Sequence, residues 1–258
     1  AATPGATVLV KANGRSNSES GREGLVNIVT GGTITPIWSN MTWSSVDGWL
    51  RRLMTDRAGA SVEVGVMRTL SGESVEIPIT PLAMRASEGR TLEIMIQPRN
   101  VRNYDTPIIQ CLDTVTIGEG AEAVTSFVGL KVTGDRITLL TTNRQNVDTQ
   151  TVKYDCDEPI HLAIVVNPVY SEAGSAFAAC MVFINGQRQR IFAYDRDLNV
   201  SSHLFIGSAD ADVDTFDIRT YDKALTHGEI ETKCVNWEKS LYDKAYMKNL
   251  FNIRENGK

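Results

Sequence analysis

Short stretches in which apolar and polar residues alternate run through most of the chain, and turn residues separate them. Alternation at every second position predicts a strand with one buried face, and residues 61–67 and 91–97 show it most clearly. Residues 161–166 are apolar and β-branched instead, which favours a central strand buried on both faces. Further strands are predicted at residues 7–11, 107–112, 130–133, 136–140, 152–156, 180–184, 187–194, 204–207 and 215–221.

Two dipeptides predict where strands turn back on themselves. Gly134-Asp135 and Asn185-Gly186 each lie between two predicted strands. Both pairs tolerate positive φ, which lets the paired strands keep their natural twist. We therefore expect a hairpin at each position. The strand over residues 91–97 should end at Pro98, because proline cannot donate to the sheet.

Two segments favour a helix. One is residues 49–55, and the other is the tail after Thr226, where apolar residues partly recur at helical spacing. Thr226 and Glu229 fit a capping box, in which the two side chains satisfy each other's backbone N–H groups. A C-terminal helix should therefore begin at about Thr226.

Together these elements predict an all-β fold, a two-sheet antiparallel β-sandwich with a short C-terminal helix. The 258 residues fit one large domain, because no linker or internal repeat divides them. We place the sandwich at residues 1–235 and a helical extension, or a linker to a downstream region, at residues 236–258. The chain starts at Ala1 without a Met or an export segment, which indicates either a processed terminus or a cut from a longer chain. Because residues 251–258 do not resemble a natural end either, we expect a fragment of a larger polypeptide.

Composition and charge exclude several classes of protein. Hydrophobic residues make up 42% of the chain and charged residues 22%, as in ordinary globular domains. The net charge of −5 gives no basic patch for nucleic acid, and no apolar stretch is long enough to cross a membrane. Neither nucleic acid nor membrane insertion is expected. No heptad run specifies an oligomer, although assembly through the parent protein is possible.

Cysteine and histidine are too sparse for a disulfide scaffold or a zinc site. The four cysteines are widely spread and form no CxxC pair, and the three histidines stand singly. Cys111 and Cys180 fall in apolar strands, where a free thiol packs as a small hydrophobe. No cofactor and no metal ligand is assigned.

The run from residue 214 to residue 230 joins a strand, a turn and the start of a helix. Residues 216–225 resemble the Ile-Arg-x-Tyr-x-x-Ala-Leu ending of laminin-G-like, concanavalin A-like jelly-roll sandwiches, and residues 183–186 resemble their aromatic-x-Asn/Asp-Gly hairpin. The resemblance covers roughly residues 82–236. One departure is that Pro159 and Ile160 precede His161, where the family often has a Trp. We expect Phe216, Ile218 and Thr220 to share one face of the closing strand, and Asp217, Arg219 and Tyr221 the other.

Residues 13–17, 31–37 and 43–49 look like the lead-in of laminin-G-like domains in large structural proteins of tailed bacteriophages. The resemblance implies a non-enzymatic structural or adhesive surface domain of a virion protein. Its expected partners are glycans and other domains of the virion polypeptide. The alternative is a secreted bacterial carbohydrate-binding module attached to a polysaccharide-degrading enzyme. A third hypothesis is a sandwich hydrolase or lyase whose acidic pair is not apparent in the sequence.

Two groups of residues are candidates for ligand binding. Asp210, Asp212 and Asp214 alternate in a way that could supply oxygen ligands to Ca²⁺, but the run lacks the Gly and the distal Glu of a dedicated calcium loop. A solvated acidic loop is the favoured interpretation. The tryptophans at positions 38, 43 and 49 could stack on a sugar, although large aromatic residues more often belong to a core.

Catalytic pairs of carboxylates are not evident. Glu63 and Glu93 each lack an acidic neighbour two residues away, and Glu73 and Glu76 point to opposite faces of any strand. Three further acidic residues, Asp155, Asp157 and Glu158, surround Cys156 in a charged turn. No catalytic residue is therefore assigned, and the residues that bind a ligand stay open.

Overall fold

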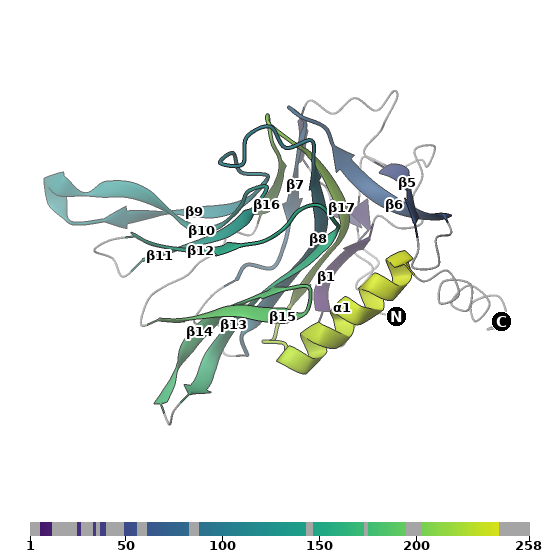
Figure 1. Ribbon diagram of the computed structural model, residues 1–258. Coiled ribbons are helices and arrows are strands. Elements are labelled where there is room, and N and C mark those ends of the chain that lie inside the picture. Colours follow the sequence, from purple (N-terminus) through teal and green to yellow (C-terminus); the bar gives the residue numbers. More distant parts are fainter. Residues whose placement is uncertain are drawn as a thin grey trace.

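The computed structural model describes residues 6–11, 25–26, 33–34, 37–39, 49–55, 61–82, 88–142, 147–172, 175–194 and 203–242. Two antiparallel sheets face each other, and one C-terminal helix lies outside them (Figure 1). The predicted two-sheet antiparallel β-sandwich is confirmed. The division of the chain into a sandwich at residues 1–235 and an extension at residues 236–258 stays a prediction.

The first sheet has eight strands and the second has seven. The first runs in the order β15 (Gln187–Tyr194), β14 (Ser175–Ile184), β13 (Ile160–Glu172), β8 (Arg90–Arg99), β17 (Asp212–Tyr221), β6 (Ser61–Thr69) and β5 (Trp49–Thr55), with β1 (Ala6–Lys11) on β17. The second runs in the order β12 (Val147–Lys153), β11 (Arg136–Thr142), β10 (Val124–Val132), β9 (Ile109–Ile117), β16 (His203–Gly207), β7 (Ser74–Pro78) and β4 (Ile37–Ser39). A separate pair joins β2 (Leu25–Val26) and β3 (Thr33–Ile34).

The core lies between the two sheets and consists of their inward-facing aliphatic side chains. Ile94 and Ile164 come from the first sheet, and Ile77, Leu130 and Ile206 from the second; all five are buried. Every residue of β13 from Ile160 to Val166 is buried, as a strand covered on both faces should be. The prediction of a central strand at residues 161–166 is therefore confirmed.

One face of β13 faces the core between the sheets. The helix α1 (His227–Tyr242) covers the other face and lies on the outer side of the first sheet (Figure 1). Ile230 packs with Phe183 and Tyr221 of that sheet. The capping box is confirmed, because the backbone N–H of Thr226 donates to Glu229 Oε2 at 2.8 Å and that of Glu229 donates to Thr226 Oγ1 at 3.2 Å. The helix thus begins where its sequence signal lies.

Both predicted hairpins are present. Asn185 and Gly186 have φ values of 51° and 78°, the pair of positive φ angles that a two-residue hairpin with the twist of its strands requires. At the other hairpin, the N–H of Thr133 donates to the carbonyl of Arg136 at 2.8 Å. The turn residues alone were therefore sufficient to predict both hairpins.

The predicted helix at residues 49–55 is wrong, because this segment is the strand β5. It pairs antiparallel with β6 over its full length, from Trp49 opposite Met67 to Thr55 opposite Ser61. Pairing with a neighbouring strand thus overrides the weak local preference for a helix.

Strand β8 also continues past its predicted end. It runs through Pro98 to Arg99, and Pro98 lies opposite Val213 of β17. On the other side, the pairing with β13 ends at Ile96, so the missing N–H of Pro98 interrupts no pairing with that strand.

The prediction that Phe216 shares one face of the closing strand with Ile218 is also wrong. The register of β17 against β8 shifts between Thr215 and Asp217, which is a β-bulge. Phe216 therefore leaves the face of Ile218 and packs edge-on against Trp237 of the helix, with ring centroids 5.9 Å apart. Ile218 remains in the core between the sheets.

Candidate functional site

Five connections that are far apart in sequence meet at one end of the sandwich. They comprise residues 70–73, 100–108, 133–135, 154–159 and 208–211, and we call them the loop end. The N–H of Gly72 donates to the carbonyl of Ser208 at 2.8 Å, and that of Arg102 to the carbonyl of Asp210 at 2.7 Å. The N–H of Tyr154 donates to the carbonyl of Asp135 at 2.8 Å. These backbone bonds hold the loops in fixed positions, as a preformed binding surface requires.

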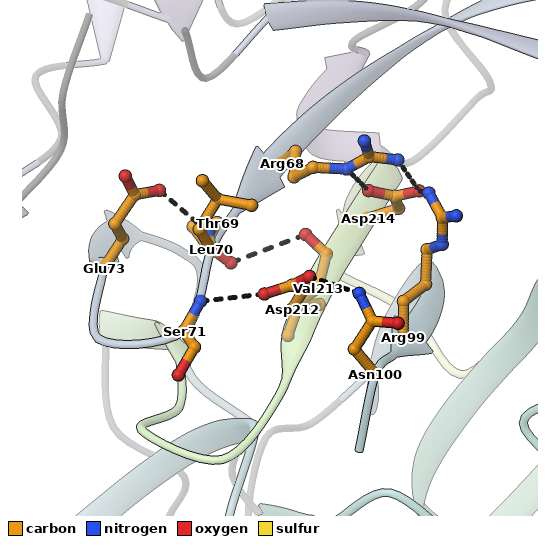
Figure 2. A network of polar contacts seen from close by, with 10 residues as sticks. All are labelled: Arg68, Thr69, Leu70, Ser71, Glu73, Arg99, Asn100, Asp212, Val213 and Asp214. Atoms are coloured by element: carbon orange, nitrogen blue, oxygen red, sulfur yellow. Dashed lines mark hydrogen bonds and ion pairs between the residues drawn. The ribbon is translucent and has the colours of Figure 1, made fainter. Parts of the chain in front are cut away.

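The aspartates at positions 210, 212 and 214, here the aspartate cluster, lie at the loop end and the start of β17. The carboxylate of Asp214 is buried and accepts two bonds from Arg68, from Nε at 2.6 Å and from Nη2 at 2.8 Å (Figure 2). Arg99 Nη1 approaches the same carboxylate at 3.5 Å. The hydrogen bond to Asp214 raises the pKa of Arg68 although burial opposes this. This bidentate pair ties β17 to β6.

The other two aspartates accept bonds from the neighbouring loops. Asp212 Oδ1 accepts from the N–H of Ser71 at 2.9 Å, and Asp212 Oδ2 accepts from Asn100 Nδ2 at 2.7 Å (Figure 2). Thr106 Oγ1 donates to Asp210 Oδ2 at 2.5 Å. Rather than lying free in solvent, Asp210 and Asp212 cross-link the loops, and Asp214 joins the strands β17 and β6. Within the described ranges, no group of three His, Cys, Asp or Glu side chains is placed to hold a metal ion.

The loop end presents a partly exposed aromatic ring. Tyr104 is 46% exposed and belongs to the connection between β8 and β9. Its ring lies against Gly134, where an added Cβ would come within 2.9 Å of Tyr104 Cδ1. Glycine therefore leaves the space that the ring occupies, and the turn holds the ring in place with one part facing solvent.

Charged side chains lie in the same loops as this ring. Arg136 contacts Asp105 through Nη2 at 3.1 Å and Asp135 through Nε at 2.8 Å. The hydrogen bond from Arg136 holds the pKa of Asp135 below its usual value, so this carboxylate is ionised near neutral pH. The ring thus has hydrogen-bond donors and acceptors beside it.

The charged turn around Cys156 also lies close to Tyr104. Electrostatic interactions with the thiol of Cys156 and with the carboxylate of Asp157 raise the pKa of Tyr104. Burial, followed by the charge of Asp157, raises the pKa of the Cys156 thiol itself. A thiol with a raised pKa is a poor nucleophile at neutral pH, so Cys156 does not suggest covalent catalysis. All four cysteines are free thiols, and Cys111 and Cys180 are buried as predicted.

A second polar group, buried beneath the helix α1, consists of Glu93, His161 and Tyr221. His161 Nε2 lies 2.9 Å from Glu93 Oε1, and the hydroxyl of Tyr221 donates to Glu93 Oε2 at 2.5 Å. We call this the Glu93 network. Burial would raise the pKa of Glu93, but the hydrogen bonds from His161 and Tyr221 and the charges of His161 and Arg219 outweigh burial and lower it. The Trp237 ring covers His161 at a centroid distance of 6.2 Å.

The Glu93 network has no access to a substrate, because the side chains of Glu93 and His161 are fully buried. Its role is structural, as it joins β8, β13 and β17 below the helix. The sequence analysis did not group these residues. Glu93 and His161 both interrupt apolar strands, however, and because buried charged groups must find partners, this pattern could have indicated that the two residues pair.

Several residues that the sequence suggested lie wholly or partly outside the described residues. Trp43 is one of them, whereas Trp38 and Trp49 are described only as backbone positions in β4 and β5. The hypothesis of a tryptophan platform for a sugar therefore stays a prediction. Glu63 belongs to β6, again as a backbone position. Glu73 lies in the turn before β7, where its Oε2 accepts a bond from the N–H of Leu70 at 2.8 Å.

Structural comparison finds the same architecture in receptor-binding domains of botulinum neurotoxins. The domain of type G has a TM-score of 0.54 at 12% identity, and that of serotype D has 0.56 at 11%. A serotype D ligand-binding domain in complex with N-acetylneuraminic acid has a TM-score of 0.55, also at 11% identity. The likeness shows the fold alone.

The matches cover 90% of this chain and 51 to 53% of the neurotoxin domains, so the chain spans about half their length. No protein-family model and no curated protein sequence matches the chain. Membership of the laminin-G-like family therefore stays a prediction. No helix of the described part of the chain is long and apolar enough to span a membrane.

Proposed function

We propose that this chain is a non-enzymatic surface domain that binds glycans at the loop end. The observation that carries the proposal is Tyr104, a partly exposed ring fixed on rigid loops with Arg136, Asp105 and Asp135 beside it. A sugar is recognised by stacking of its apolar face on an aromatic ring and by polar side chains that bond its hydroxyls. Tyr104 supplies the first contact and its charged neighbours supply the second.

The fold comparison supports the same class of function. The similar structures are receptor-binding domains, and one of them holds N-acetylneuraminic acid. A β-sandwich by itself serves many functions, so the fold alone does not decide the matter. The proposal rests on the combination of this fold with a rigid, partly exposed aromatic ring.

The charges at the loop end favour binding over hydrolysis. A glycoside hydrolase needs one carboxylic acid with a raised pKa to protonate the leaving oxygen. The pKa of Asp135 is lowered instead, because Arg136 donates a hydrogen bond to it. Asp105 contacts the same guanidinium, and Glu93 is buried beneath the helix. Asp105 and Asp135 are therefore suited to accept hydrogen bonds from the hydroxyl groups of a sugar.

The setting that we propose is the virion of a tailed bacteriophage, with other domains of the virion polypeptide as partners. This part rests on the sequence resemblance of residues 13–17, 31–37 and 43–49. A secreted carbohydrate-binding module is the alternative. The sequence of the parent polypeptide would separate the two, because flanking virion repeats support the first and a neighbouring hydrolase domain supports the second.

A glycan array tests the binding proposal. The protein should give a defined set of positive glycans, and Tyr104→Ala should lose them. Phe205→Ala is the matched control, because Phe205 is another exposed aromatic residue but lies on the strand β16. If the array stays negative with folded protein, or if Tyr104→Ala binds as the unchanged protein does, the proposal is wrong.

A further inference from the structure

The hairpin of β9 and β10 extends beyond the sandwich. Residues 113–127, which we call the arm, comprise the end of β9, a turn with a short 3₁₀ helix (Gly120–Glu122) and the start of β10. In Figure 1 the arm projects away from the rest of the molecule. Among the described strands, residues 113–117 pair only with β10, and residues 124–128 pair only with β9.

The arm exposes apolar side chains to solvent. None of its residues is buried, and Val124 and Phe127 are 63% and 55% exposed. Val115 and Ile117 are only half-buried. An isolated two-stranded hairpin is marginally stable in water, and exposed apolar groups of this kind mark interaction surfaces.

The base of the arm is held in one geometry. Gly129 has a φ of 129°, and a Cβ at this position would lie 2.2 Å from the carbonyl oxygen of Cys111. Only glycine permits this close approach of the two strands, so the direction in which the arm leaves the sheet is fixed. A fixed arm presents its apolar side chains without a large ordering cost on binding.

The charge of the arm selects its partner. The arm carries Asp113, Glu119 and Glu122 and contains no Lys, Arg or His. The whole chain has a net charge of −5, which opposes docking of the arm on a second copy. Nucleic acid and anionic membranes are repelled for the same reason. A cationic surface with an apolar groove offers the complementary charge and covers Val124 and Phe127.

We propose that the arm is a docking element for a positively charged protein surface that contains an apolar groove. Acidic residues steer the two surfaces together and the apolar side chains supply the buried contact. The association therefore weakens as salt concentration rises. This interaction is separate from the glycan site, because the arm and Tyr104 belong to different connections of the chain.

Selection from a surface-displayed random peptide library on the full chain tests the proposal. The chain with residues 114–126 replaced by a short Gly-Asn-Gly turn serves for counter-selection. Peptides that depend on the arm should alternate Lys or Arg with Val, Ile or Phe. Their binding should weaken at least tenfold in the double variant Val124→Ser/Phe127→Ser and in the triple variant Asp113→Asn/Glu119→Gln/Glu122→Gln.

The double variant Val235→Ser/Glu231→Gln, which changes exposed positions on the helix α1, is the control and should bind normally. Urea unfolding curves should show that all variants fold. Arm-dependent peptides that are neutral or acidic, or no arm-dependent peptide at all, would overturn the proposal. Arm-dependent dimers in analytical ultracentrifugation, or arm-dependent binding to phosphatidylcholine vesicles, would assign the arm to a second copy or a lipid surface and overturn it as well.

Discussion

Replacement of Tyr221 by Phe removes one hydroxyl from the Glu93 network and leaves the shape of the core unchanged. That hydroxyl donates to the carboxylate of Glu93 at 2.5 Å, and both side chains are fully buried. A hydrogen bond to a charged group contributes about 1.5–3 kcal/mol, and water cannot replace it here. We expect the free energy of unfolding to fall by about 2 kcal/mol, which is roughly a thirty-fold change in the equilibrium constant.

Urea unfolding at neutral pH measures this loss, with tryptophan fluorescence as the signal because Trp237 covers the network. Tyr154→Phe is the matched control. The hydroxyl of Tyr154 donates to the carbonyl of Thr133, a neutral acceptor, so its removal should cost only about 1 kcal/mol. Equal losses in the two variants would show that the charge of Glu93 does not strengthen the bond.

The pH dependence provides a second readout. The pKa of Glu93 is lower in the folded than in the unfolded chain, where it is about 4.5. The stability that this carboxylate contributes is therefore fully present above pH 4.5 and is lost as the pH falls through the folded pKa. Tyr221→Phe removes one of the hydrogen bonds that lower the pKa of Glu93. The difference in free energy of unfolding between the variant and the unchanged protein should therefore shrink in acid. A difference below 0.5 kcal/mol at pH 7, or one that grows on acidification, would refute this reasoning.

Four further substitutions test other parts of the structure. Asp214→Asn should destabilise the protein by about 3 kcal/mol, because it breaks a buried bidentate pair with an arginine; a urea midpoint close to that of the unchanged protein would contradict this. Gly129→Ala should cost about 2–3 kcal/mol, because its Cβ would collide with backbone. Gly72→Ala should cost only about 1 kcal/mol in the same assay, because its φ is positive but the space around it is open. Thr226→Ala should cost about 1 kcal/mol and speed amide exchange in the first turn of the helix α1, and unchanged exchange would argue against the capping box.

Features that depend on neighbouring residues could be predicted from the sequence. Asn185 and Gly186 specify their hairpin because both must adopt positive φ, and Thr226 with Glu229 specifies the start of the helix. The apolar run at residues 161–166 identified a strand covered on both faces. Each of these signals lies within a few residues of the feature that it produces.

Features that depend on distant residues could not be predicted in the same way. Residues 49–55 form a strand because β6 pairs with them, and Phe216 changes face because β17 is bulged against β8. The loop end joins five connections whose order in space follows from sheet topology, so the pairing of Tyr104 with Gly134 is not visible in the sequence. The aspartate cluster was visible as a pattern, but its partners Arg68 and Asn100 were not.

The most direct test of glycan binding at the loop end is a calorimetric titration of the array's strongest glycan into the protein. Tyr104→Ala should weaken binding at least tenfold, as loss of an aromatic anchor does, whereas Tyr104→Phe should retain most of the affinity because the ring is kept. Phe205→Ala should bind as the unchanged protein does. Unchanged affinity in Tyr104→Ala would place the sugar elsewhere on the sandwich and contradict the proposed site.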